Sequence, residues 1–532
     1  MSGTGLAALA AAYFLLLLLV GRLVGGKGDN DTFFRAGRQS PWWAVAYGMI
    51  GASISGVTFV SVPGMVGATQ FTYLQTCMGF FLGYVFVACF LLPVYYRMNL
   101  TSIYTYLDKR LGLSSYITGA SFFFLSKLAG ASIRLYLVCS ILQHFIFDGL
   151  GVNFVATAAL VLLLIWLYTM YSGIKTIVWT DCLQTTVLLV SLVLIITQAC
   201  RGMGLSLGEA CSRVWSDPMS RIFDFGDPQG RQYFWKQFLS GIFIPIVMTG
   251  LDQDMMQKNL TCKTLRQSQL NMCLNGLFYV PVNLLFLMLG GILFLMCAQM
   301  GLQVPAAGDE LLPTLCSSGL LGQASMACFT IGIVAAAFSS ADSALTSLTT
   351  CFCVDLARKP NSVWFRRVAH FGIACSLLLV ILVVRAVGSS SVIDAVYTVC
   401  GYTYGPLLGL FAFGMLTRRK PRAWFVPIAC VVSPVVCFAM DWAVRTYTTY
   451  RFGYELLMVN GLLVFLLLLL SSTKFRADDT GGDSTFKLSV VGLSGGNDGM
   501  SSLCVTNGRT WAEMPLPSLP MMMRPLEPNG CE

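Results

Sequence analysis

Charged residues are scarce in this sequence. Asp, Glu, Lys and Arg make up 11% of its 532 residues, whereas soluble domains carry about 25%. A chain with so little charge cannot be mostly exposed to water, which excludes an ordinary soluble protein. Apolar sequence takes its place, because 56% of the residues are hydrophobic. Several runs approach or exceed the ~20 residues that cross a bilayer as a helix. The composition predicts an all-α polytopic protein whose environment is the lipid bilayer.

Groups that carry enzyme chemistry are few as well. The chain has two histidines, His144 and His370, and its 19 cysteines include no CxxC pair. It contains no phosphate-binding loop and no nucleic-acid motif. We therefore expect no enzyme activity, no organic cofactor and no nucleic-acid partner. A repeated pore-lining filter segment is also missing, which disfavours a channel.

The apolar stretches predict about thirteen transmembrane helices. The first is an extra N-terminal span, and the last two, within 421–472, are extra C-terminal spans. The predicted spans are 6–25, 42–69, 73–96, 117–147, 152–172, 175–200, 232–255, 270–299, 322–356, 364–387, 390–417, 421–443 and 453–472.

Lys and Arg are concentrated on one side of these spans. With the N-terminus outside, Lys109, Arg110 and the run 418–420 all fall on the inner side. Positive residues are retained on the cytoplasmic side, so we expect a plasma-membrane protein with its N-terminus outside and its C-terminus in the cytoplasm. Residues 1–476 form the membrane domain in this prediction. The composition changes abruptly beyond it, and 477–532 is predicted to be a disordered cytoplasmic tail.

Two predicted spans contain helix-breaking residues. The stretch 49–63 reads MIGASISGVTFVSVP, and the span 232–255 contains Pro245 and Gly250 before the charged run LDQDMMQ. Interrupted helices at corresponding positions of two halves are typical of an inverted-repeat transporter with its site at the bilayer midplane. Small residues also let membrane helices pack closely, so a packing role for the first stretch stays open.

Polar residues gather on one later span. Residues 335–350 read AAAFSSADSALTSLTT, and Ser339, Asp342 and Ser343 recur on one helix face. Hard cations prefer oxygen ligands, and hydroxyls and carbonyls without formal charge suit a monovalent ion. We therefore expect a Na⁺ site where this face meets the interrupted first core helix. Asp181 also lies inside a span, where an ionisable group usually faces a cavity or a partner.

Two basic residues lie within the predicted span 117–147. Lys127 and Arg134 are seven positions apart and so share a helix face. Arg134 cannot lose its proton, and it needs an acidic partner, carbonyls or an anionic ligand at this depth. A structural pair with Asp181 or another buried carboxylate would meet that need, and so would a bound anion.

Motifs on the predicted spans make the chain resemble the sodium/solute symporter family, which includes proline, sugar, iodide, monocarboxylate and sialic acid symporters. The resemblance covers residues 1–475. The motifs are FRAGR, ASISGVTFVSVPG, WTDCLQ, DQDMMQKNLTCK, SSADSALTSL and GYTYGPLLGLFAFGML. It implies a LeuT-like fold of two inverted five-helix repeats, here at 42–200 and 232–417. It also implies Na⁺-coupled symport of a small organic solute by alternating access, with Na⁺ as the coupling ion.

The resemblance also implies ligand positions for Na⁺. The main site would use three backbone carbonyls and two hydroxyls, from Gly51, Ile54, Ala336, Ser339 and Ser340. Asp181 matches the family aspartate near the inner sodium path. Some members, notably sialic acid symporters, use a second sodium site beside it. The matching positions here are Asp181, Ser339, Asp342 and Ser343. Those members have a serine where this chain has Asp342.

The resemblance favours an anionic solute. The sugar-transporting branch has Gln or His where this chain has Thr58, and Arg134 falls where a sialic acid symporter has its carboxylate-binding arginine. We expect a carboxylate-bearing solute such as sialic acid or a monocarboxylate. The predicted contacts are Thr58, Ser61, Phe81, Arg134 and Thr249. The alternatives are a neutral sugar or polyol-like solute, and a transporter-like sensor, for which the tail is too short to hold a signalling domain.

Overall fold

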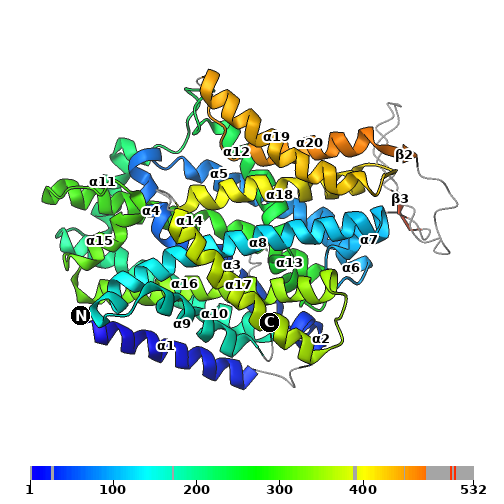
Figure 1. The fold of residues 1–532 in the computed structure, drawn as a ribbon. Coiled ribbons are helices and arrows are strands. Elements are labelled where there is room, and N and C mark those ends of the chain that lie inside the picture. The colour runs from blue at the N-terminus through cyan, green and yellow to red at the C-terminus, as the bar shows by residue number, and fades with distance from the viewer. Residues whose placement is uncertain are drawn as a thin grey trace, which may run out of the picture.

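The computed structural model is a bundle of long, mostly apolar helices (Figure 1). It describes residues 3–24, 29–170, 173–387, 392–448, 450–474, 504–505 and 509–510. The longer helices are α1 (Gly3–Val24), α3 (Trp42–Ser53), α4 (Gly56–Thr69), α5 (Tyr73–Phe86), α8 (Leu113–Leu142), α9 (Phe154–Thr169), α10 (Ile174–Gly202), α12 (Phe234–Pro245), α14 (Leu265–Met300), α16 (Gly322–Thr350), α17 (Val363–Val387), α18 (Val392–Leu416), α19 (Phe425–Tyr447) and α20 (Leu456–Leu470). The shorter helices are α2 (Asn30–Arg35), α6 (Leu92–Arg97), α7 (Thr105–Leu111), α11 (Leu207–Ser216), α13 (Gln253–Asn259) and α15 (Leu311–Ser317).

Many of these helices are long and apolar enough to cross a membrane. Among the described residues, nine helices meet that condition, and eleven do when each of two bent pairs is counted as one span. The apolar helices α9 and α20 are shorter, at 16 and 15 residues. The protein is therefore a multi-pass membrane protein, as predicted, while the count of thirteen spans is not confirmed.

Helix α16 lies at the centre of the packing that positions the site. Helices α3, α4, α8 and α10 all contact it, and α10 also packs along α3. Helix α1 runs along one edge of the bundle against α10 and α16, whereas α19 and α20 lie at the opposite edge in Figure 1. The strand β1 (Arg419–Pro421) pairs antiparallel with β2 (Ser472–Lys474) next to these two helices.

Small residues let α3 approach α10 closely. A Cβ atom on Gly51 would overlap the Thr185 hydroxyl, and one on Gly48 would lie 2.8 Å from the Asp181 Cβ. Such overlaps force neighbouring atoms to move, and tightly packed interiors resist that. The packing role that the sequence allowed for this stretch is therefore present, and it brings the backbone of α3 next to Asp181.

The predicted domain boundaries stay predictions. Each predicted repeat begins with one of the bent pairs, α3–α4 and then α12–α13. The predicted tail, 477–532, lies outside the described residues apart from β3 (Cys504–Val505) and β4 (Arg509–Thr510), which pair antiparallel.

Candidate functional site

Both helix interruptions expected from the sequence are present. The chain bends by 51° between α3 and α4 and by 70° between α12 and α13. At the first bend Ile54 and Ser55 have extended backbone angles, and the Ser55 side chain accepts a hydrogen bond from the Thr58 N–H, at 3.4 Å. At the second, a π-helical turn (Ile246–Gly250) leads into α13, whose N-cap is Asp252.

The first bend releases backbone oxygens. A helix leaves the carbonyls of its last turn without partners inside the helix. The Gly51 carbonyl accepts one hydrogen bond from the Ile54 N–H, at 3.0 Å, which uses one of its two lone pairs. Ile54 stands between the two helices, so its carbonyl belongs to neither helical ladder. Carbonyl oxygens of this kind are suitable ligands for a hard cation.

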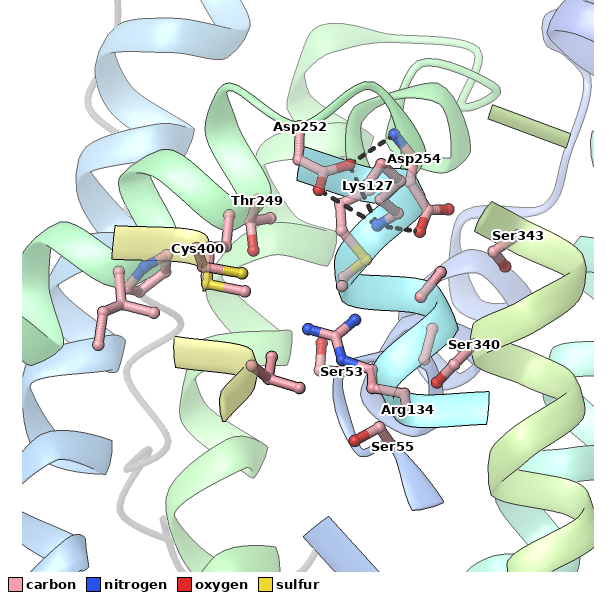
Figure 2. A pocket seen from close by; sticks show the side chains of 18 of the residues that line it. Ser53, Ser55, Lys127, Arg134, Thr249, Asp252, Asp254, Ser340, Ser343 and Cys400 are labelled. Carbon is pink, nitrogen blue, oxygen red and sulfur yellow. Dashed lines mark hydrogen bonds and ion pairs between the residues drawn. The ribbon is translucent and has the colours of Figure 1, made fainter. Parts of the chain in front are cut away.

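A cavity opens beside both bends (Figure 2). Its volume is about 110 Å³, and because one water needs roughly 10–15 Å³ by the same measure, it has room for several waters or a small organic solute. Its walls come from the α3–α4 bend, α5, α8, α12 with the π-helical turn, α13, α14, α16 and α18. The polar residues of the lining include Ser53, Ser55, Thr58, Lys127, Arg134, Thr249, Asp252, Asp254, Lys258, Ser339, Ser340, Ser343 and Tyr404.

Two adjacent serines of α16, Ser339 and Ser340, face the α3–α4 bend and differ in their hydrogen bonding. The Ser340 Oγ is buried and has no hydrogen-bond partner within the described part of the chain, although the residue lines the cavity. The Ser339 Oγ donates to the Asp181 carboxylate at 2.6 Å, which leaves its oxygen lone pairs for a ligand. Ala336, one turn earlier, is buried at 1% exposure. A buried hydroxyl without a partner is costly unless a ligand satisfies it.

The two buried carboxylates near these serines have different partners. Asp181 forms an ion pair with Lys258, with 2.7 Å between its Oδ2 and the Lys258 Nζ, and both side chains are 2% exposed. Asp342 instead accepts a hydrogen bond from the Tyr168 hydroxyl at 2.8 Å and lies 3.1 Å from the Ser343 Oγ. The four residues that the resemblance places at a second cation site therefore do lie together, but a lysine ammonium lies with them.

A second buried ion-pair cluster closes one end of the cavity. The Lys127 Nζ lies 2.6 Å from Asp254 and 3.2 Å from Asp252, and the Tyr404 hydroxyl donates to Asp252 at 2.7 Å. Figure 2 shows the ammonium held between the two carboxylates. The sequence singled out Lys127 but not its partners. The charged run after Gly250 was the available signal, since charges inside a bilayer require partners.

Arg134 has a guanidinium that is open to a ligand. It stands on α8, and Figure 2 shows its guanidinium directed into the cavity near Ser53 and Ser55. No hydrogen bond or ion pair to Arg134 is found among the described residues. The structural pair with Asp181 is not formed, because Lys258 occupies that carboxylate.

The other predicted solute contacts divide into two groups. Thr58 and Thr249 line the cavity. Ser61 and Phe81 are not among its lining residues; Ser61 is buried and its hydroxyl has no partner in the described structure. Phe80 lines the cavity in place of Phe81, with its ring stacked 4.9 Å from that of Tyr279.

Three comparisons place this geometry among known proteins. The family model described as "Sodium:solute symporter family" matches residues 33–423. The sodium/sialic acid symporter SiaT of Proteus mirabilis is 25% identical over 454 residues, which cover 80% of this chain and 87% of that protein. The human sodium/iodide cotransporter is 26% identical over 421 residues, covering 75% of this chain and 63% of that protein.

A solved structure has a similar fold. A Na⁺-coupled sialic acid symporter, in a substrate-bound outward-open state, superposes with a TM-score of 0.74 at 21% identity, over 88% of this chain and 99% of that one. This similarity confirms the predicted all-helical LeuT-like fold.

Proposed function

This chain belongs to the sodium:solute symporter family, and we propose that it couples inward movement of Na⁺ to uptake of a small organic anion by alternating access. The relatives that match it are transporters. The observation that carries the choice of an anion is the Arg134 guanidinium, which points into the cavity and has no protein partner among the described residues. A guanidinium binds a carboxylate through two parallel hydrogen bonds.

The proposed Na⁺ site lies where the α3–α4 bend meets α16. Its ligands would be the carbonyls of Gly51, Ile54 and Ala336 and the hydroxyls of Ser339 and Ser340. The unpartnered Ser340 Oγ supports this assignment, because a bound ion would satisfy it. A set of oxygens without formal charge suits a monovalent cation that must also leave again.

The proposed solute site lies on the other side of the same bend. Arg134 would bind a carboxylate, Thr58 and Thr249 would donate or accept hydrogen bonds, and the stacked pair of Phe80 and Tyr279 would cover an apolar part of the solute. Ser61 and Phe81 would act only indirectly, because the cavity does not reach them.

The bend offers a direct route for coupling. Ile54 would bind the ion, while Ser55 and Thr58, on the next turn, line the solute cavity. Either ligand would then favour the same geometry of α3 and α4, so each would raise the affinity for the other. Asp181 lies beside the ion site and would face the inner sodium path once the bundle opens inward.

The orientation and the excluded roles are part of the same proposal. We expect the N-terminus outside, the C-terminus in the cytoplasm of a plasma membrane, and neither enzyme activity, organic cofactor nor nucleic-acid partner. Single cysteines placed at 2 and 480 in a cysteine-depleted chain would test the orientation. Labelling of residue 480 by a membrane-impermeant maleimide in intact cells would contradict it.

Uptake into proteoliposomes tests the function. A panel of labelled sialic acids, monocarboxylates, sugars and polyols is offered with and without an inward Na⁺ gradient. We expect Na⁺-dependent uptake of a carboxylate, its loss in Arg134→Met, and a half-saturating Na⁺ concentration at least about tenfold higher in Ser340→Ala, since tenfold corresponds to ~1.4 kcal/mol.

Two matched controls keep the test specific. Ser325→Ala removes a hydroxyl from the same helix that bonds only to its own backbone at Leu321, and Arg201→Met removes an exposed arginine. Both should transport like the wild type. Uptake of a neutral sugar that is unaffected by Arg134→Met would favour the neutral-solute alternative. Binding without any uptake would favour the sensor.

A further inference from the structure

The second cation position beside Asp181 already contains a positive charge. Asp181, Ser339, Asp342 and Ser343 lie together, and the Lys258 Nζ lies 2.7 Å from the Asp181 Oδ2. We propose that the Lys258 ammonium is a built-in cation at this position and that the chain therefore exchanges a single Na⁺ per transport cycle. The proposal rests on the Na⁺-coupled function proposed above and specifies its stoichiometry.

The oxygens of Asp181 are both in use. One accepts the Ser339 hydroxyl at 2.6 Å, and the other contacts the Lys258 ammonium. The pair is almost completely buried, with both side chains 2% exposed. Buried charges require partners, and this partner is covalently part of the chain. A Na⁺ ion that bound the same carboxylate would have to share it with a second positive charge at contact distance, and the two would repel each other.

The oxygens of Asp342 are also in use. Oδ2 accepts the Tyr168 hydroxyl at 2.8 Å, and Oδ1 lies 3.1 Å from the Ser343 Oγ. Asp342 interacts electrostatically with both Asp181 and Lys258. Two carboxylates so close to each other require a positive charge nearby, and the ammonium supplies one without a bound ion.

The proposed Na⁺ site, between the α3–α4 bend and α16, differs in this respect. The Ser340 Oγ is buried without a protein partner in the described part of the chain, and the residue lines the cavity. Of the two cation positions, one presents unsatisfied oxygen and the other is filled by a side chain. This contrast is the structural basis for a stoichiometry of one.

The filled position also joins two helices of the bundle. Lys258 stands on α13, the second half of the α12–α13 bend, and Asp181 stands on α10. A Na⁺ ion at this position would leave toward the cytoplasm in each cycle, whereas a lysine can only move with its helix. The ion pair therefore fixes α13 to α10 in whichever state forms it.

Sodium binding without solute tests the proposal directly. The full chain is purified into lipid nanodiscs, and ²²Na⁺ binding is measured at saturation by scintillation proximity. We expect one bound Na⁺ per wild-type chain. Lys258→Ala removes the ammonium and leaves space beside Asp181, so we expect bound Na⁺ at saturation to rise twofold.

Two companion variants separate the effect of charge from the effect of side-chain size. Lys258→Arg keeps the tethered charge, and the double variant Lys258→Met with Asp181→Asn removes both charges and fills the space. Both should bind one Na⁺. The wild-type count alone still tests the proposal if Lys258→Ala does not fold.

The possible failures are distinguishable. Two Na⁺ per wild-type chain, or one per folded Lys258→Ala chain, would overturn the built-in cation while leaving Na⁺ coupling intact. Absence of Na⁺ binding in the wild type, with Ser340→Ala unchanged, would instead refute the proposed function on which the inference depends.

Discussion

The two bent helices of the bundle are built from opposite kinds of residue. The stretch 49–63, which contains the α3–α4 bend, has no charged side chain, whereas Asp252, Asp254 and Lys258 follow the π-helical turn within eight positions. Yet the second half of each begins with a side-chain N-cap, Ser55 on α4 and Asp252 on α13. A helix bend followed by a side-chain N-cap therefore occurs twice, once with a neutral capping residue and once with a charged one.

The difference separates two tasks that a symporter has to combine. The neutral bend offers backbone and hydroxyl oxygens, which bind a monovalent ion weakly enough to release it. The charged bend is held by Lys127 from α8 and pairs through Lys258 with α10. Ion pairs of this depth resist separation because each partner left alone is a buried charge. We infer that Na⁺ and solute bind and leave at the first bend. The second bend holds α8, α10 and α13 together by its ion pairs while they do so.

The largest expected effect comes from removing the cation that holds the charged bend. Lys127→Met leaves Asp252 and Asp254 buried without their ammonium, and breaking such a pair costs about 3–5 kcal/mol. Equilibrium unfolding in mixed detergent micelles measures the loss. Adding Asp252→Asn and Asp254→Asn to the same chain should recover part of it. A single variant as stable as the wild type would show that the charged bend is not held by this cluster.

A smaller effect is expected where a tyrosine supports the same cluster. Tyr404→Phe removes the hydroxyl that donates to Asp252 at 2.7 Å, and hydrogen bonds to charged groups contribute about 1.5–3 kcal/mol. Tyr402→Phe is the matched control, since its hydroxyl lies 3.4 Å from Asp441 and is only partly buried. The free energy of unfolding should fall more for Tyr404→Phe. Equal losses in the two variants would contradict a special role for Asp252.

The neutral bend should respond to volume instead of charge. Gly51→Ala places a Cβ against the Thr185 hydroxyl, and overpacking of this kind typically costs about 1–3 kcal/mol. We also expect weaker Na⁺ binding, because α3 must move away from α10. Gly208→Ala, at a glycine with open space around it, is the control. If Gly51→Ala destabilises no more than Gly208→Ala, the close approach of the two helices is not required.

The smallest effect is expected at the neutral N-cap. Ser55→Ala removes the side chain that caps α4, a loss of about 1 kcal/mol. Because the Ser55 hydroxyl is not among the proposed Na⁺ ligands, Na⁺ affinity should change less than in Ser340→Ala. Ser55→Asn keeps a capping side chain and should restore stability. A failure of Asn to do so would point to a direct ligand role for the Ser55 hydroxyl.

Much of this arrangement could be predicted from the sequence because it depends on local pattern. Gly and Ser in 49–63 predicted an interrupted helix, and the structure has a bend there. The helical spacing in 335–350 predicted that Ser339, Asp342 and Ser343 share a face, and all three lie near Asp181. Breaks and faces follow from nearest neighbours along the chain, which a sequence displays directly.

The features that the sequence did not predict depend on the direction of side chains around a helix and on ion-pair partners that are distant along the chain. Each residue turns a helix by about 100°, so placing the solute contact at Phe81 instead of Phe80 directs it out of the cavity. Lys258 and Asp181, like Lys127 and Asp252, belong to separate helices that meet only in the folded bundle. The sequence showed that these charges needed partners, but several carboxylates competed for each base.

The ion pair of Lys258 with Asp181 has an energetic consequence for the cell. If the only mobile cation is one Na⁺ and the solute is a monoanion, the loaded carrier moves no net charge. Membrane voltage then does no work on the cycle, although 100 mV is worth about 2.3 kcal/mol for each charge that crosses. The Na⁺ concentration ratio alone would limit accumulation, so a tenfold ratio could sustain at most a tenfold solute gradient. A lysine in place of an ion would thus decide which form of stored energy the carrier can use.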